Sequence, residues 1–303
     1  MSERQQSHMK KLSPYLIFIA AMLWATDAPF RMQLTKDLNS NFIVLAEHFV
    51  DVLFIAPILI VGFRRLKNLT RKEWVAVMFI SVCGSALASV AFTQAFHYVN
   101  PSVAILLQKL QPFIAISLAA GILKEKLTIR YWEWAIFAIL GAYLVSFPGL
   151  KPEFFPGEQL NPNLIGVGYA LLAALFWGAS TVFGKYLLRN VDFKIVTGLR
   201  FSIAFVFMLI LNVATGSIPT LSQVNLADWI FIVVISVASG VVALFIYYKG
   251  LENTKASVAT IAELGFPMAA VVVNWIFLGA NLVPMQLVGM SILVFSIFRL
   301  TRL

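Results

Sequence analysis

Cysteine is nearly absent from this chain of 303 residues: Cys83 is the only one, so no disulfide can form within the chain. The three histidines are scattered, without the spacing of metal ligands, and no Gly-rich phosphate loop precedes a lysine. Only 12% of the residues are charged, and no convincing catalytic triad is present. These absences predict a protein that is not an enzyme, holds no metal or cofactor and does not drive itself with ATP.

Apolar side chains are abundant instead, at 60% of the sequence with 26 phenylalanines. Continuous apolar runs approach the roughly 20 residues that a helix needs to cross a bilayer. A transmembrane β-barrel would show alternating rather than continuous apolar positions. We therefore predict an all-α polytopic membrane protein with ten transmembrane helices. The predicted spans are 14–30, 42–62, 74–96, 101–123, 131–147, 163–184, 195–214, 228–248, 256–278 and 282–298.

The ten runs fall into two groups of five that resemble each other. At a constant spacing, Ser102, Val103, Ala104, Pro112 and Ala115 recur as Ser257, Val258, Ala259, Pro267 and Ala270. This order indicates an internal repeat. Because five is odd, the second group must enter the membrane from the opposite side, and inverted repeats of this kind usually enclose a binding site near the midplane. We predict a first repeat over residues 1–150 and an inverted second repeat over 151–303.

The basic residues predict the orientation. Most of the 23 lysines and arginines lie in connections that face one side, whereas the opposite connections hold only Arg31, Lys36 and Lys151. Cytoplasmic loops carry the excess of basic residues, so both termini are predicted to be cytoplasmic, in the inner (plasma) membrane. The net charge of +9 is then explained by basic loops that contact anionic lipid, without a need for nucleic acid as a partner.

Several short motifs, in this order along the chain, resemble the EamA-type branch of the drug/metabolite transporter superfamily. They are Trp24-Ala25, Asn100-Pro101-Ser102, Leu110-Gln111-Pro112, Leu123-Lys124-Glu125-Lys126-Leu127, Trp177-Gly178, Arg200-Phe201 and Gly265-Phe266-Pro267. The chain departs from the pattern at His48, where many relatives have arginine, and at Ala280, where a glutamate would match Glu125. The resemblance implies secondary transport of small solutes, often export of amino acids, metabolites or drugs.

Ionisable side chains within the predicted spans are candidate site residues, because they are costly in lipid unless they face a partner or a wet cavity. The outer half holds Asp27, Glu47, His48, Asp51 and Lys109. They could bind a cationic group, a proton or both, because clustered carboxylates favour protonation of one another. Alternatively, Lys109 neutralises one carboxylate and the rest lie in headgroup water. Asp27 fits that second interpretation best, because it lies nearest a predicted helix end.

The inner half holds Arg200 and Glu263. Both lie near the cytoplasmic ends of their predicted helices, so the two side chains could meet. Arg200 could hold a substrate carboxylate while Glu263 holds an amino group or a proton. The alternative is a structural ion pair that locks the inner gate, since arginine–carboxylate pairs join helices well.

Pro112 and Pro267 are predicted to interrupt the fourth and ninth helices, because a proline leaves a backbone carbonyl without its hydrogen bond. Such a carbonyl is tolerated at the midplane where it lines a cavity, so these two helices are predicted to form cavity walls. The alternative is that both prolines only shape the packing. Aromatic and polar side chains nearby would complete the walls. The predicted substrate-binding residues are Trp24, Gln94, Gln108, Lys109, Gln111, Trp177, Arg200, Tyr247, Tyr248 and Glu263. The predicted coupling residues are Asp27, Glu47, His48, Asp51 and Glu263.

Together these features predict a secondary transporter that exports an amino acid or a related zwitterionic or cationic metabolite by alternating access. Its partners would be the small-molecule substrate and membrane lipid, with proton coupling left open. Small-residue ridges are compatible with a monomer or a homodimer. The alternatives are an exporter of cationic drugs and a non-transporting membrane sensor or partner module.

Overall fold

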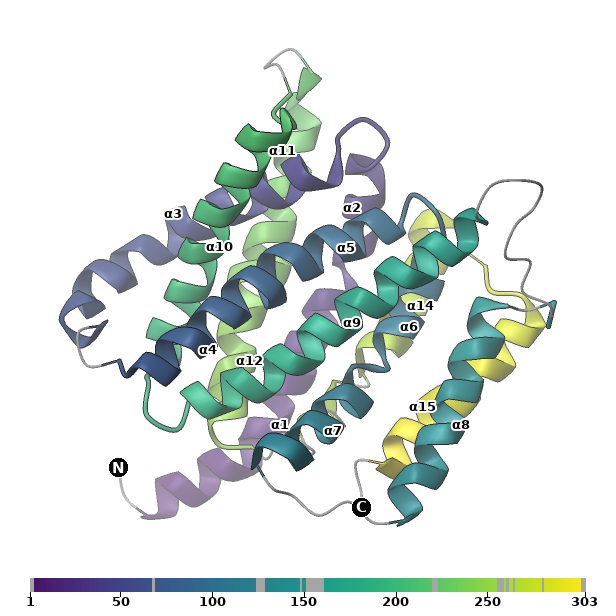
Figure 1. Cartoon of the computed structure of the whole chain (residues 1–303), viewed down its shortest axis with the longest axis horizontal. Helices are drawn as coiled ribbons and strands as arrows, with labels where there is room; N and C mark the ends of the chain where they lie inside the picture. The colour runs from purple at the N-terminus through teal and green to yellow at the C-terminus, as the bar shows by residue number, and fades with distance from the viewer. Residues whose placement is uncertain are drawn as a thin grey trace.

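The computed structural model describes residues 3–66, 69–123, 129–147, 149–150, 161–219, 223–254, 259, 262–263, 265–279 and 281–300. Within these ranges the chain consists of helices joined by short connections and contains no strand. The helices lie side by side as long rods (Figure 1). The all-α prediction is confirmed for this part of the chain.

The helices of the first half follow the predicted spans closely. They are α1 (Glu3–Ala25), α2 (Asp27–Leu34), α3 (Ser40–Leu66), α4 (Arg71–Ser81), the π-helical segment η1 (Val82–Leu87), α5 (Ala88–Ala95), α6 (Pro101–Gln108), α7 (Gln111–Leu123) and α8 (Ile129–Ser146). α4, η1 and α5 follow one another without a break. The first predicted span needs a correction: its helix stops at Ala25, and Asp27 begins a second helix that continues to Leu34.

The second half contains α9 (Pro162–Leu187), α10 (Phe193–Thr215), α11 (Leu226–Val234), the π-helical segment η3 (Ile235–Val242), α12 (Ala243–Glu252), α14 (Gly265–Leu278) and α15 (Pro284–Leu300). Like the third predicted span, the eighth is one continuous rod with a π-helical middle. The local sequence explains where two of these helices begin. Asn100 and Asn161 cap α6 and α9 through their side chains, and each precedes a proline that needs no hydrogen-bond acceptor.

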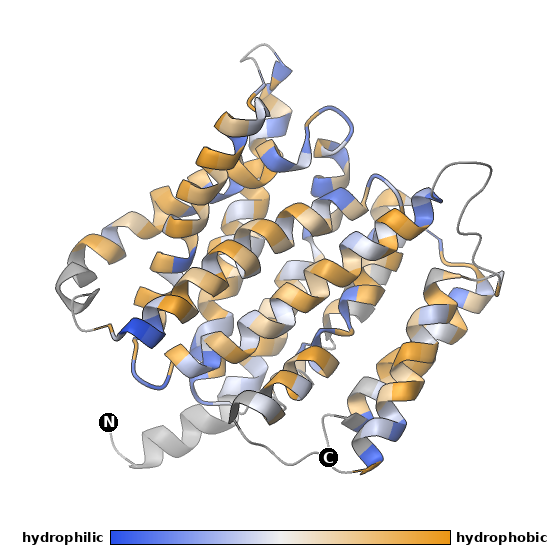
Figure 2. Ribbon diagram, viewed as in Figure 1, coloured by the Kyte–Doolittle hydropathy of each residue, from blue (hydrophilic) through white to orange (hydrophobic). Residues whose placement is uncertain are grey.

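The described segments include six that are long and apolar enough to cross a membrane. They are Ser40–Pro57, Arg71–Ala95, Pro101–Leu118, Pro162–Leu187, Phe193–Thr215 and Leu226–Glu252, with shorter apolar helices at Trp132–Val145 and Pro284–Ser296. Large apolar side chains such as Ile60, Ile210 and Phe277 are exposed, and apolar residues colour most of the helix surfaces (Figure 2). A soluble protein rarely exposes so much contiguous apolar surface, so we describe a multi-pass membrane protein.

Contacts between distant segments hold the helices together. α3 packs on α10, α1 on α12, α5 on α9, and α8 on α15. α8 and α15 lie together at one side of the molecule (Figure 1). Their contact depends on two facing glycines, because a Cβ on Gly141 would lie 2.8 Å from the Gly289 carbonyl oxygen and 2.7 Å from the Leu293 backbone nitrogen. Small residues allow helices in a membrane to approach this closely.

We expect Gly141→Leu to lower the melting temperature of the purified protein by about 5 °C or more, because overpacking such a contact typically costs about 1–3 kcal/mol. Gly121→Leu is the matched control, since a Cβ on Gly121 of α7 meets no atom within 4 Å. Thermal unfolding in detergent measures both. Equal melting temperatures for the two variants would contradict the close α8–α15 contact.

Candidate functional site

A cavity lies between helices from both halves of the chain. Its empty space is about 1080 Å³ when the open solvent at its mouth is included. Most of the predicted site residues line it: Trp24, Asp27, Glu47, His48, Asp51, Gln108, Lys109, Gln111, Trp177, Arg200, Tyr247, Tyr248 and Glu263. The structure therefore brings together side chains that are far apart in the sequence.

A helix break forms one wall of the cavity. α6 ends at Gln108 and α7 begins at Gln111, and Lys109 and Leu110 form a turn between them. Pro112 is the second residue of α7, where a proline leaves no intrahelical hydrogen bond unmade. The break thus places Gln108, Lys109 and Gln111 on the cavity wall. Pro267 occupies the corresponding first turn of α14.

Lys109 and Glu263 bring opposite charges to the same cavity. The Lys109 ammonium lies 4.0 Å from the centre of the Phe266 ring, a cation–π contact. Glu263 Oε1 accepts a hydrogen bond of 2.8 Å from the Tyr247 hydroxyl. Both charged side chains are buried, at 4% exposure each.

Arg31 is the most important residue that the sequence analysis missed. It was placed in an outer connection, but it is buried in α2. Its Nε donates to both oxygens of Asp27 at 2.9 and 3.1 Å. Its Nη1 and Nη2 lie 2.9 and 3.1 Å from the two oxygens of Glu47, and Nη1 also donates to Thr93 Oγ1 at 2.7 Å. One guanidinium therefore joins α2, α3 and α5, and it supplies Asp27 with an ion-pair partner.

Arg200 makes a different set of contacts from the predicted one. Nε donates to Ser85 Oγ at 2.8 Å, Nη1 to the Tyr248 hydroxyl at 2.7 Å, and Nη2 to the Gly84 carbonyl oxygen at 2.8 Å. The predicted pair with Glu263 is wrong, because the two side chains bond to different partners. Among the described residues no carboxylate lies within ion-pair distance of Arg200.

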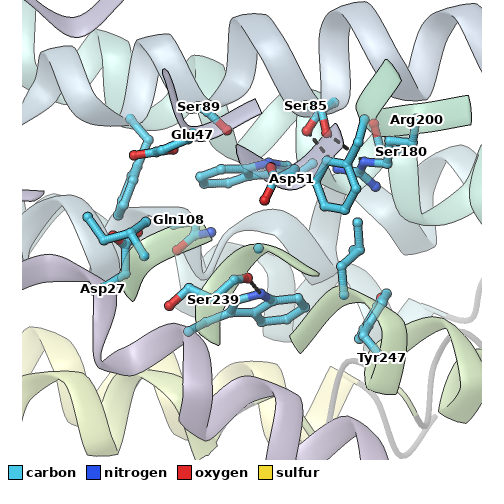
Figure 3. Close-up of a pocket in the computed structure, with 18 of the residues that line it drawn as sticks. Asp27, Glu47, Asp51, Ser85, Ser89, Gln108, Ser180, Arg200, Ser239 and Tyr247 are labelled. Carbon is cyan, nitrogen blue, oxygen red and sulfur yellow. Dashed lines mark hydrogen bonds between the residues drawn. The ribbon is translucent and has the colours of Figure 1, made fainter. Parts of the chain in front are cut away.

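Besides Glu47 Oε1, which is ion-paired with Arg31, four polar side chains on the cavity wall have an atom without a hydrogen-bond partner in the described part of the chain. These atoms are His48 Nε2, Asp51 Oδ1, Gln108 Oε1 and Ser180 Oγ. Asp51 and Gln108 point toward the middle of the cavity (Figure 3). Buried polar atoms are almost always paired in native proteins, so these positions are where a ligand would bind.

Aromatic rings form the rest of the wall. Trp24 packs against Tyr247 with ring centres 5.1 Å apart, and Trp177 against Phe92 at 5.2 Å. The Trp24 indole is fixed by a 3.0 Å hydrogen bond from Nε1 to the Ser239 carbonyl oxygen (Figure 3). Planar solutes stack on such rings.

Gln94 is the predicted binding residue that does not line the cavity. Its Oε1 accepts a 2.8 Å hydrogen bond from the Ser40 hydroxyl. It lies two residues after Phe92, which does line the cavity, and residues two apart on a helix face in different directions. Ser85 and Ser180, which also line the cavity, were not predicted as site residues. Ser85 belongs to a ridge of small residues, and nothing in the sequence singled out Ser180.

The sequence profile of the EamA-like transporter family matches residues 12–147 and 164–302. The chain belongs to this family. The riboflavin transporter ImpX of Fusobacterium nucleatum is 31% identical to this EamA-like transporter over 294 residues, covering 95% of this chain and 97% of that one. An uncharacterized transporter of Clostridium kluyveri is 24% identical, over 71% of this chain and 69% of its own. A solved crystal structure covers 95% of both chains with a TM-score of 0.66 at 15% identity, a likeness of fold alone.

Membership of this family makes the protein a membrane transporter with a small molecule as its substrate. The cavity of this EamA-like transporter is the site where that substrate would meet residues from both halves. The roles of the individual lining residues remain predictions.

Proposed function

We propose that this EamA-like transporter moves riboflavin, or a planar heterocycle much like it, across the membrane by alternating access. The observation that carries the proposal is the cavity whose walls combine aromatic rings with buried, unpaired polar atoms. A flavin ring would stack on Trp24 or Trp177 and direct its polar edges at the remaining groups. The 31% identity with a riboflavin transporter over nearly the whole chain supports this substrate.

The ten-span inverted repeat, divided near residue 150, belongs to the same proposal. Two observations support it. The π-helical segments η1 and η3 occupy corresponding positions in the third and eighth predicted spans. Helices also pack in matching pairs. α5 contacts α9, and their repeat mates α12 and α1 contact each other in the same way. α3 packs on its own repeat mate α10, and α8 packs on its own repeat mate α15. Two halves related in this way can rock around a fixed central site. Cytoplasmic termini in the inner membrane remain a prediction from the loop charges.

A zwitterionic amino acid is the second candidate. The specific observation in its favour is that Lys109, Arg200, Asp51 and Glu263 all line the cavity without forming an ion pair among the described residues. Buried charges are normally compensated, and a substrate that carries both charges would compensate them. Export, predicted from the family resemblance, is the direction we propose for either substrate.

Transport into proteoliposomes tests the function. We expect saturable uptake of labelled riboflavin by vesicles that contain the full chain and none by empty vesicles. A panel of labelled amino acids is run in parallel. Movement of an amino acid without movement of riboflavin would transfer the proposal to the second candidate. Binding of riboflavin without flux would favour a sensor instead of a transporter.

We assign proton coupling to Glu263. Asp27 and Glu47 are each held by Arg31, whereas Glu263 accepts one bond from Tyr247 and faces the cavity near Lys109. We expect Glu263→Gln to bind substrate but to lose acceleration by an imposed pH gradient, because glutamine cannot release a proton. The same uptake assay, with and without the gradient, measures this. Unchanged acceleration in Glu263→Gln would exclude this residue as the coupling site.

A further inference from the structure

Three of the unpaired polar side chains on the cavity wall are almost fully buried. Asp51 is 2% exposed, Ser180 2% and His48 4%. Each lines the cavity and has an atom with no hydrogen-bond partner among the described residues: Asp51 Oδ1, Ser180 Oγ and His48 Nε2. Native proteins rarely leave such atoms unpaired, so a ligand in the cavity would have to satisfy all three.

The unpaired atoms are mainly acceptors. His48 Nδ1 lies 2.8 Å from the Val44 carbonyl oxygen, which can only accept, so Nδ1 carries the hydrogen and Nε2 of the neutral ring accepts. A carboxylate oxygen such as Asp51 Oδ1 also accepts. The Ser180 hydroxyl can donate or accept. A matching ligand therefore presents several donors, and hydroxyl groups fit all three atoms because each hydroxyl can both donate and accept.

The three side chains come from α3 and α9, which both contribute residues to the wall of the cavity. His48 and Asp51 lie one helical turn apart on α3. Asp51 Oδ1 would be only 2.6 Å from a Cβ on Gly240 of η3, and Ser180 of α9 is packed against Gly84 of η1. Arg200 Nη2 donates to the carbonyl oxygen of the same Gly84. Asp51, Ser180 and Arg200 are drawn in the same part of the close-up (Figure 3).

We propose that His48, Asp51 and Ser180 form a polyol subsite, which binds the hydroxylated chain of a substrate whose aromatic ring stacks on the cavity tryptophans. The inference deepens the proposed function and rests on it. It names the substrate class as an aromatic heterocycle that bears several hydroxyl groups, as riboflavin does on its ribityl chain. It also assigns Asp51 to substrate binding and leaves proton coupling to Glu263.

The test compares riboflavin with lumiflavin, which has the same ring but a methyl group in place of the ribityl chain. Isothermal titration calorimetry on the full chain in detergent measures both affinities. We expect the wild-type protein to bind riboflavin about tenfold or more tightly than lumiflavin, since several hydrogen bonds to buried polar groups are together worth at least that factor. Asp51→Leu should remove most of this preference by weakening riboflavin alone.

Asp51→Asn separates hydroxyl binding from proton transfer. Its amide oxygen still accepts a hydrogen bond, so most of the preference for riboflavin should remain, whereas Asp51→Leu should lose it. If Asp51 served only to carry a proton, both variants would keep the full preference. Ser180→Ala is the milder second variant, which decides the matter if Asp51→Leu does not fold; it should reduce the preference several-fold. Ser81→Ala is the control, because Ser81 is buried outside the cavity and donates to the Val77 carbonyl oxygen.

The outcomes distinguish the two proposals. If the wild-type protein binds neither flavin, the proposed function fails. If it binds both flavins equally, riboflavin remains a substrate but the polyol subsite is overturned. The subsite is also overturned if the preference for riboflavin is unchanged in both Asp51→Leu and Ser180→Ala. If Asp51→Leu cannot be purified, an unchanged preference in Ser180→Ala alone overturns it.

Discussion

Replacing Arg31 with leucine should leave the protein severely destabilised, with little folded material recovered from the membrane. The guanidinium is the shared partner of Asp27 and Glu47, and the three side chains have exposures of 6%, 15% and 7%. Removing one member of a buried ion pair typically costs about 3–5 kcal/mol, because the remaining charge is left buried without compensation. Here two carboxylates lose their partner at once, and Thr93 loses a donor.

Two further variants show whether charge is the cause. Arg31→Leu combined with Asp27→Asn and Glu47→Gln removes the stranded charges and should recover much of the folded yield. Arg31→Lys should be intermediate, because an ammonium cannot form the two-pronged contact with Glu47 while also reaching Asp27. Yield after size-exclusion chromatography and the melting temperature in detergent are the readouts. A wild-type melting temperature for Arg31→Leu alone would show that this network does not hold α2, α3 and α5 together.

The position of Arg31 also shows why the first helix could not be predicted fully. A charged residue after an apolar run normally marks the end of a span, so the predicted helix stopped at Phe30 and Arg31 was placed in a connection. The chain instead starts α2 at Asp27, and Arg31 lies four residues later on the same face. That spacing was visible in the sequence. Glu47 and Thr93, which complete the site for the guanidinium, come from other helices and could be known only from the packing.

The cavity residues were easier to predict than their partners. An ionisable group in lipid must find a partner or a wet cavity. This rule singled out Glu47, His48, Asp51, Lys109 and Glu263, and all five side chains line the same cavity. It does not say which donor meets which acceptor, because that depends on how each helix is rotated. Arg200 accordingly bonds to Ser85, Tyr248 and Gly84 rather than to Glu263.

Arg200→Met should have the opposite consequence to Arg31→Leu: nearly normal stability with little transport. The atoms that Arg200 contacts belong to neutral groups, and each such hydrogen bond contributes only about 0.5–1.5 kcal/mol. Burying the guanidinium is itself unfavourable, and no carboxylate among the described residues offsets it. Its removal should therefore shift the melting temperature by only a few degrees, while transport falls about ten- to a hundredfold through loss of a charged donor to the substrate.

The comparison between the two arginines decides what Arg200 is for. Both are buried, at 5% exposure for Arg31 and 7% for Arg200, so their desolvation costs are similar. They differ because Arg31 is paired with carboxylates and Arg200 is not. Tyr248→Phe, which removes one acceptor of Arg200 and keeps the ring, should leave both folding and most of the transport intact. If Arg200→Met instead unfolds as readily as Arg31→Leu, then Arg200 is a structural lock between α10, η1 and α12, and the cavity binds its substrate without it.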